Sequence, residues 1–164
     1  MGRRVWPATG VLATPTLPIH EHDITTGWHK SAPAKADFVL LDPPYWMQAA
    51  ERYSSDPADL GNMSLGDFLA AWRKTIRTCA DHLTPGGQLA FIVSPAEDTK
   101  GDRVVDLAMH MCRVCEDQGL RCRRRIIALY NGHQQATGQQ VIWARENKKL
   151  LKLYRDIIVM RRED

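Results

Sequence analysis

The sequence predicts an α/β fold with a largely parallel sheet and helices on its faces. A continuous apolar run at 36–42, ADFVLLD, ends at two prolines and is typical of a strand buried on both faces. A segment with apolar residues at helical spacing follows, and a Pro-Gly-Gly turn separates it from a second apolar run at 88–94. This order of strand, helix, turn and strand is typical of a parallel βαβ unit.

The N-terminal half has clear boundary signals. Residues 1–18 are rich in Pro, Thr and Gly and predict an irregular lead-in, and residues 19–24 are long enough only for an edge strand. Ser64 is a candidate N-cap, with Asp67 three residues later, for a helix whose apolar positions continue to Leu83.

The C-terminal half repeats the pattern. An amphipathic segment at 102–119 predicts a second helix, and residues 123–130 predict a third strand. A polar insert at 131–149 separates this strand from a last one at about 152–161. Because little helix lies between the last two strands, we expect them to be antiparallel. Residues 19–164 are therefore predicted to form one domain.

Composition and charge narrow the class of protein. The chain has 164 residues, of which 44% are hydrophobic and 25% charged, and this suits one globular domain. It has no apolar run long enough for a bilayer and no signal peptide, so we expect a soluble cytoplasmic protein that does not bind membranes. The net charge is +3, but two basic clusters stand out, RCRRR at 121–125 and MRRED at 160–164. They form either a solvated edge or a phosphate-facing patch.

A metal site is not expected. Cys112 and Cys115 have the CxxC spacing of a zinc ligand pair, but the chain has no second pair. Both cysteines also fall on the second predicted helix, where small apolar residues belong in the core.

The segment DPPYW, directly after the first predicted strand, carries the most specific pattern. Ligands of α/β sheets bind beyond the carboxyl ends of the strands, which is where Asp42 falls. Pro43 and Pro44 fix the backbone and remove two donors, so that the corner offers acceptors. Tyr45 and Trp46 add aromatic faces.

These groups suit a planar ring that carries an amino group. Asp42 and the carbonyl of Pro43 can accept its two hydrogens, and an aromatic side chain can stack on the ring, which contributes roughly 1–3 kcal/mol per base. Hydrogen bonds from both N–H groups localise the nitrogen lone pair, so the nitrogen can attack an electrophilic methyl group directly. The alternative interpretation is a simple strand terminator, because Asp-Pro pairs are common in loops.

DPPYW at the end of a hydrophobic strand resembles the catalytic motif of the amino-group DNA methyltransferases, which use S-adenosylmethionine to methylate adenine N6 or cytosine N4. Asp at the first position is similar to the adenine-N6 members. HLTPGGQLAFIVSP (82–95) and KLLKLYRDIIVMRR (149–162) resemble later stretches of the same fold, so the likeness covers residues 19–162. It implies a Rossmann-like S-adenosylmethionine-dependent methyltransferase fold, with a largely parallel sheet and an antiparallel last strand.

The resemblance also implies roles for the residues of the corner. Asp42 and Pro43 would accept hydrogen bonds from the target amino group, and Asp42 would also border the cofactor. Tyr45 would stack on the base, Pro44 would keep the corner rigid, and Trp46 would help to bind the substrate.

Further contacts are implied outside the corner. Asp23 lies where the family often has an acid near the adenine of the cofactor. The insert at 131–149 is a candidate target-recognition segment, with His133, Gln134 and Gln135 as substrate-binding residues, because Gln can pair with adenine in the major groove; the alternative is a solvated loop. The implied partner is duplex DNA with the target base flipped out.

The chain departs from the family at the cofactor site. The family binds S-adenosylmethionine through a Gly-rich turn after a strand, and the sequence has no such turn. We therefore expect a fold that is incomplete at its N-terminus, with a second chain or a missing N-terminal segment supplying the cofactor loop. The alternatives are a degenerate nucleic-acid-binding or regulatory partner with the same fold, and an RNA amino-group methyltransferase.

Overall fold

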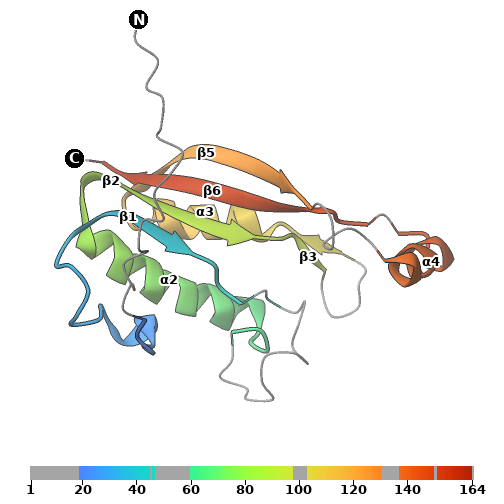
Figure 1. Ribbon diagram of the computed structural model, residues 1–164, viewed down its shortest axis with the longest axis horizontal. Helices are drawn as coiled ribbons and strands as arrows, with labels where there is room; N and C mark the ends of the chain where they lie inside the picture. The colour runs from blue at the N-terminus through green and yellow to red at the C-terminus, as the bar shows by residue number, and fades with distance from the viewer. Residues whose placement is uncertain are drawn as a thin grey trace, which may run out of the picture.

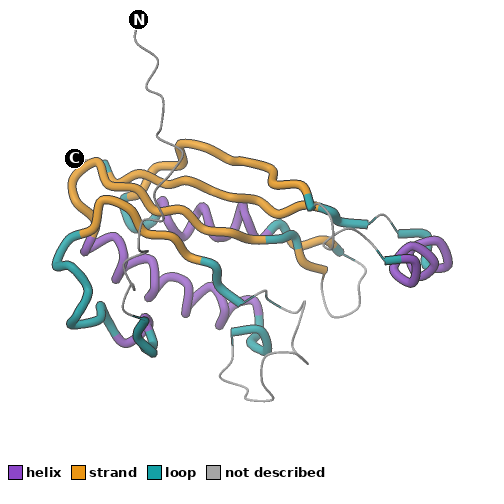
Figure 2. The backbone as a smooth tube through the Cα atoms, in the orientation of Figure 1, coloured by secondary structure: helices purple, strands orange, loops and turns teal. Residues whose placement is uncertain are grey.

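The structure is a computed structural model that describes residues 19–44, 46, 60–97, 103–130, 137–149 and 151–163. The described part forms a four-stranded sheet with two helices on one face and a third helix beyond one end of the sheet (Figure 1, Figure 2). The elements, in chain order, are η1 (Ile24–Thr26), β1 (Ala36–Leu41), α2 (Leu65–His82), β2 (Leu83–Val93), β3 (Ala96–Glu97), β4 (Val104–Val105), α3 (Leu107–Glu116), β5 (Leu120–Leu129), α4 (Gly138–Glu146) and β6 (Tyr154–Arg162). None of the described helices is both long and apolar enough to cross a bilayer.

The sheet has the strand order β1-β2-β6-β5. Strands β1 and β2 are parallel, and β6 runs antiparallel to both of its neighbours, β2 and β5. The strands β1, β2 and β5 therefore point the same way, and the last strand is inserted between them in the opposite direction. The predicted antiparallel last pair is confirmed. The prediction of a largely parallel sheet is corrected to a mixed sheet, because only the β1–β2 pairing of the described strands is parallel.

Helix α2 begins where its capping signal predicts. The Ser64 hydroxyl accepts a hydrogen bond from the Asp67 N–H at 3.2 Å, which satisfies one of the free donors of the first turn. The buried face packs onto the sheet, and the ring of Trp72 meets that of Phe91 edge-on at 5.3 Å. The helix ends at His82, and β2 starts at once, so that the predicted Pro-Gly-Gly turn forms the first part of this strand.

Helix α3 starts five residues later than the sequence pattern predicts. Asp106 is its N-cap, because the carboxylate accepts from the Met109 N–H at 3.0 Å. The residues before it, Val104 and Val105, pair with Ala96 and Glu97 in a short antiparallel ladder instead.

Strand β1 is buried on one face only, so the prediction that it is buried on both faces is wrong. Val39 and Leu41 pack on the core, whereas Phe38 is 56% exposed and Leu40 is 58% exposed. The reason is that both packed helices cover the same face of the sheet (Figure 1), and no described element covers the other. We call this uncovered face the outer face. β1 is also an edge strand, since it pairs only with β2.

An ion pair on the helix-covered face joins three elements. Arg125 of β5 donates two hydrogen bonds, at 2.8 and 3.1 Å, to the carboxylate of Asp156 on β6, which is fully buried. Asp106, at the start of α3, lies 4.0 Å from the same guanidinium. The hydrogen bond to Asp156 raises the pKa of Arg125 further, so this charge persists at any ordinary pH.

Candidate active site

Asp42 lies at the edge of the sheet where β1 ends. Leu41 is level with Phe91 of the parallel strand β2, so Asp42 lies beside the carboxyl end of β2 as well. We call this edge, where β1, β2 and β5 end, the rim. The Asp42 side chain is exposed, and Pro43 and Pro44 are half-buried. An exposed carboxylate at the rim of an α/β sheet can be reached by a ligand.

Trp46 does not have the placement that the sequence suggested. Its ring is only 6% exposed and belongs to the hydrophobic core, and its Nε1–H donates to the Met63 carbonyl at 2.8 Å. Burial leaves almost no ring face for a substrate, so the expectation that Trp46 helps to bind one is wrong. Trp46 instead fixes the chain after Pro44 to the segment that precedes α2.

Four predicted site residues lie outside the described residues: Tyr45, His133, Gln134 and Gln135. Asp23 is described, and it caps η1. Its carboxylate accepts from the hydroxyl of Thr25 at 2.8 Å and from the N–H of the same residue at 2.9 Å, and these hydrogen bonds lower the pKa of Asp23. η1 packs against α2 and lies toward the end of the molecule opposite the end of β1 (Figure 1, blue), so these contacts of Asp23 are not at the rim.

A polar cluster at the rim was missed from the sequence. The Ser94 hydroxyl, after β2, lies 3.4 Å from the phenol of Tyr130, after β5. Arg155 of β6 donates to the same phenol at 3.4 Å and has its guanidinium 5.4 Å from the centre of the ring. Ser94 and Tyr130 are the last residues of the strands predicted at 88–94 and 123–130, and that position is the signal that could have found them. The cluster adds a cation and two hydroxyls to the rim.

The cysteines on α3 are core residues. Burial raises the pKa of the Cys112 thiol to about 12 and also raises the pKa of Cys115, so both thiols are neutral near pH 7. Within the described part of the chain, no group of three or more His, Cys, Asp or Glu side chains has an arrangement that could hold a metal ion.

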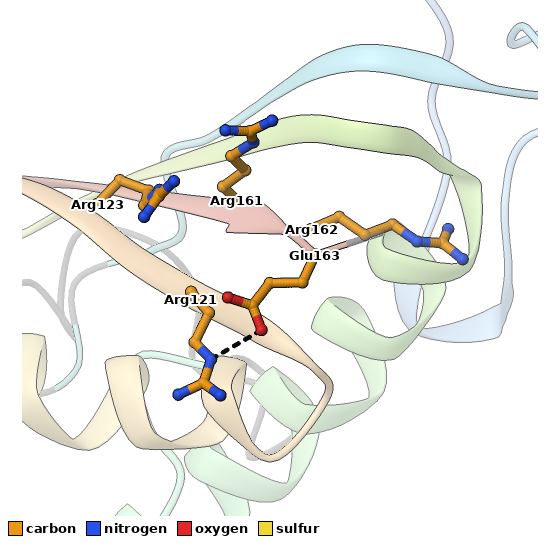
Figure 3. Close-up of a pocket in the computed structure, with 5 residues that line it drawn as sticks. All are labelled: Arg121, Arg123, Arg161, Arg162 and Glu163. Atoms are coloured by element: carbon orange, nitrogen blue, oxygen red, sulfur yellow. Dashed lines mark hydrogen bonds and ion pairs between the residues drawn. The ribbon is translucent and has the colours of Figure 1, made fainter.

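The two basic clusters come together at the end of the sheet opposite the rim. Antiparallel pairing sets Arg121, near the start of β5, opposite Arg161, near the end of β6, and Arg161 is level with Gln88 in the middle of β2. Figure 3 shows the residues around this point, which line a hollow of about 220 Å³: Arg121, Arg123, Arg161, Arg162 and Glu163. The clusters are therefore separate from Asp42.

No protein-family profile matches the sequence, and no curated protein matches it either. The fold, however, is similar to that of TTHA0409 from Thermus thermophilus, a protein assigned provisionally as a DNA modification methylase. The TM-score is 0.54 at 20% identity, over 82% of this chain and 48% of that one. For the form of TTHA0409 in complex with S-adenosyl-L-methionine, the TM-score is 0.55 at 20% identity, over 82% of this chain and 51% of that one.

A third structure of the same Thermus protein gives a TM-score of 0.51 at 21% identity. This chain therefore has a methyltransferase-like fold, and it spans about half the length of the Thermus protein.

Proposed function

We propose that this chain is the catalytic part of an S-adenosylmethionine-dependent DNA methyltransferase that methylates the N6 amino group of adenine in a flipped-out base. The observation that carries the proposal is the Asp-Pro-Pro corner directly after β1, with an exposed carboxylate at the rim. The likeness in fold to a protein solved with S-adenosyl-L-methionine supports the choice of cofactor.

The chemistry assigned to the corner is binding and activation of the amino group. Asp42 and the carbonyl of Pro43 accept the two N–H hydrogens, and Pro44 keeps that carbonyl from turning away. A nitrogen held in this way has a localised lone pair and can take up a methyl group without a covalent enzyme intermediate. When bound, S-adenosylmethionine would supply the methyl group and leave as the thioether S-adenosylhomocysteine, and the proton released from the amino group would pass to water.

The described residues form only part of a cofactor site. Asp42 is at the rim, but the other candidate, Asp23, is hydrogen-bonded to Thr25 at the 3₁₀ helix η1. We therefore propose that the cofactor loop comes from a second chain or from another segment, and that this chain mainly binds the base.

Helix α4 is the proposed core of the target-recognition segment, together with His133, Gln134 and Gln135. It projects beyond the rim end of the sheet (Figure 1), and of its side chains only that of Ala144 is buried. Val141, Ile142 and Trp143 are 42%, 57% and 50% exposed. A capping box at Thr137 and Gln140 stabilises this otherwise poorly packed helix.

The test is transfer of a labelled methyl group from S-adenosylmethionine to duplex DNA, followed by analysis of the nucleosides. The proposal predicts label in N6-methyladenine. Label in N4-methylcytosine would contradict the choice of base, and label in RNA but not in DNA would favour the RNA enzyme.

A second candidate is a nucleic-acid-binding or regulatory partner with this fold. The absence of a Gly-rich turn from the sequence favours it. Labelled methyl transfer to duplex DNA, with the partner that supplies the cofactor loop added if one is needed, separates the two. Transfer that Asp42→Ala abolishes supports the enzyme, whereas no transfer that depends on Asp42, with DNA binding retained, supports the partner.

A further inference from the structure

A second hollow lies on the outer face, away from the rim. Its volume is about 640 Å³, and three strands supply its lining: Gln88, Arg123, Arg124, Ile126, Val159 and Arg161. Arg123 and Arg161 project on the same side of the strands, whereas Arg121 points the other way toward Glu163 (Figure 3). Among the described residues, no carboxylate lines this hollow.

The three arginines that line the hollow lack the carboxylate partners that neighbouring arginines have. Arg121 pairs with Glu163 at 3.0 Å and Arg125 with Asp156 at 2.8 Å, whereas Arg123, Arg124 and Arg161 have no ion pair with any described residue. Like charges on adjacent strands oppose sheet pairing. A polyanion in the hollow would remove this repulsion.

The guanidinium of Arg161 lies over the backbone of Gly86. A Cβ atom on Gly86 would lie 3.1 Å from its Nη2, so the guanidinium packs closely on this turn. Gly86 also has φ +72°, which favours glycine there. A guanidinium is planar and offers paired donors that match two phosphate oxygens, so several of them suit a phosphodiester backbone.

The hollow lies within reach of DNA bound at the rim. Arg161 and Phe38 are each level with Gln88, and Asp42 is four residues beyond Phe38. At about 3.3 Å per residue and 4.8 Å per strand, Arg161 is roughly 16 Å from Asp42. This is about five base pairs of a duplex, at 3.4 Å each.

We propose that this hollow binds the sugar-phosphate backbone of duplex DNA in the stretch beside the target base. The proposal rests on the proposed function, because duplex DNA is the substrate assigned there. It adds an anchoring surface on the outer face of the sheet, distinct from the corner that holds the base and from helix α4.

The test is the affinity of the purified chain for a fluorescein-labelled 20-base-pair duplex, measured by anisotropy over a series of salt concentrations without S-adenosylmethionine. The variants are Arg123→Gln and Arg161→Gln. Each should weaken binding about five- to tenfold and reduce the slope of log affinity against log salt by about one. The matched control is Arg73→Gln, which removes a charge on α2 that pairs with Asp117 on the other side of the sheet.

Three outcomes would overturn the proposal. One is equal affinity and salt slope in parent and variants, as expected if the hollow instead binds the carboxylates of a protein partner. Another is an equal loss in Arg73→Gln, which would reflect net charge alone, and the third is a loss confined to a single-stranded probe. Circular dichroism confirms that each variant is folded. Because no methyl transfer is measured, failure of the Asp42-dependent transfer assay would contradict the proposed function and leave this result intact.

Discussion

Neighbouring residues in the DPPYW corner have different tasks. Asp42 is exposed at the rim, and four residues later Trp46 is buried and hydrogen-bonded to Met63. The proposed binding of an amino group requires the acceptors of Asp42 and Pro43 to be preorganised, and the proline pair at 43–44 supplies that rigidity. We therefore propose that Tyr45, rather than Trp46, makes the aromatic contact to the base.

Substitution of Tyr45 tests that assignment. Tyr45→Ala should raise KM for DNA more than it lowers kcat, because the lost stacking is worth roughly 1–3 kcal/mol in base capture. Tyr45→Trp, which keeps an aromatic face, should retain most of the affinity. Steady-state methyl transfer with varied DNA gives both constants. Equal KM values in parent and Tyr45→Ala would contradict the stacking role.

The cysteines give a prediction about thiol reactivity. Burial raises the pKa of Cys79 and Cys112 to about 12, whereas Cys122 is exposed. The thiolate is the reactive form, so at pH 8 iodoacetamide should modify Cys122 well before the other cysteines. Peptide mass analysis over time measures this order, and the same reaction in denaturant is the control. Early modification of Cys79 in the folded chain would contradict its buried position.

At the scale of elements, local sequence signals predicted the start of a helix correctly where that helix has a capping residue and an amphipathic pattern. Ser64 and the helical spacing after it predicted α2, because the cap and the buried stripe act within one segment. Helix α3 was placed too early, because Val104 and Val105 are apolar at positions that suit a helix or a strand alike. Only the partner strand, Ala96–Glu97, decides between them, and a local pattern does not contain that partner.

The cap of α2 can be tested directly. Ser64→Ala removes the side-chain acceptor for the Asp67 N–H, and this should lower the free energy of unfolding by about 1 kcal/mol. Urea unfolding followed by circular dichroism measures the change. Ser64→Thr, which keeps a hydroxyl that can accept from the Asp67 N–H and donate to its carboxylate, is the matched control and should recover most of the loss. A neutral Ser64→Ala would mean that the cap has no energetic role.

At the scale of the whole molecule, the described residues form a sheet that has helices on one face and no described element on the other. The prediction that β1 is buried on both faces failed for this reason, since an apolar run does not reveal whether a second layer exists. The position of Asp42 at the rim followed from the sequence, because a strand end and a proline pair are local features. The joining of the two basic clusters did not, because it depends on the register between β5 and β6.

The two faces of the sheet should differ in how much a leucine contributes to the free energy of unfolding. Leu40 is 58% exposed on the outer face and Leu89 is fully buried on the other. Leu89→Ala should cost about 2–5 kcal/mol, as buried leucines do, whereas Leu40→Ala should cost less than about 1 kcal/mol. Urea unfolding of both variants measures the difference. A large cost for Leu40→Ala would mean that the outer face is covered after all.

The central claim is that Asp42 activates an amino group for methyl transfer. The most direct measurement is the rate at which label passes from S-adenosylmethionine to duplex DNA with the parent chain, Asp42→Ala and the control Asp37→Ala, together with the partner that supplies the cofactor loop if one is needed. Asp37 is an exposed carboxylate on the same strand, bonded to the Thr84 hydroxyl at 2.9 Å. Asp42→Ala should lower the rate by roughly 10²–10³-fold or more while Asp37→Ala stays near the parent. Similar rates for the parent and Asp42→Ala would contradict the claim.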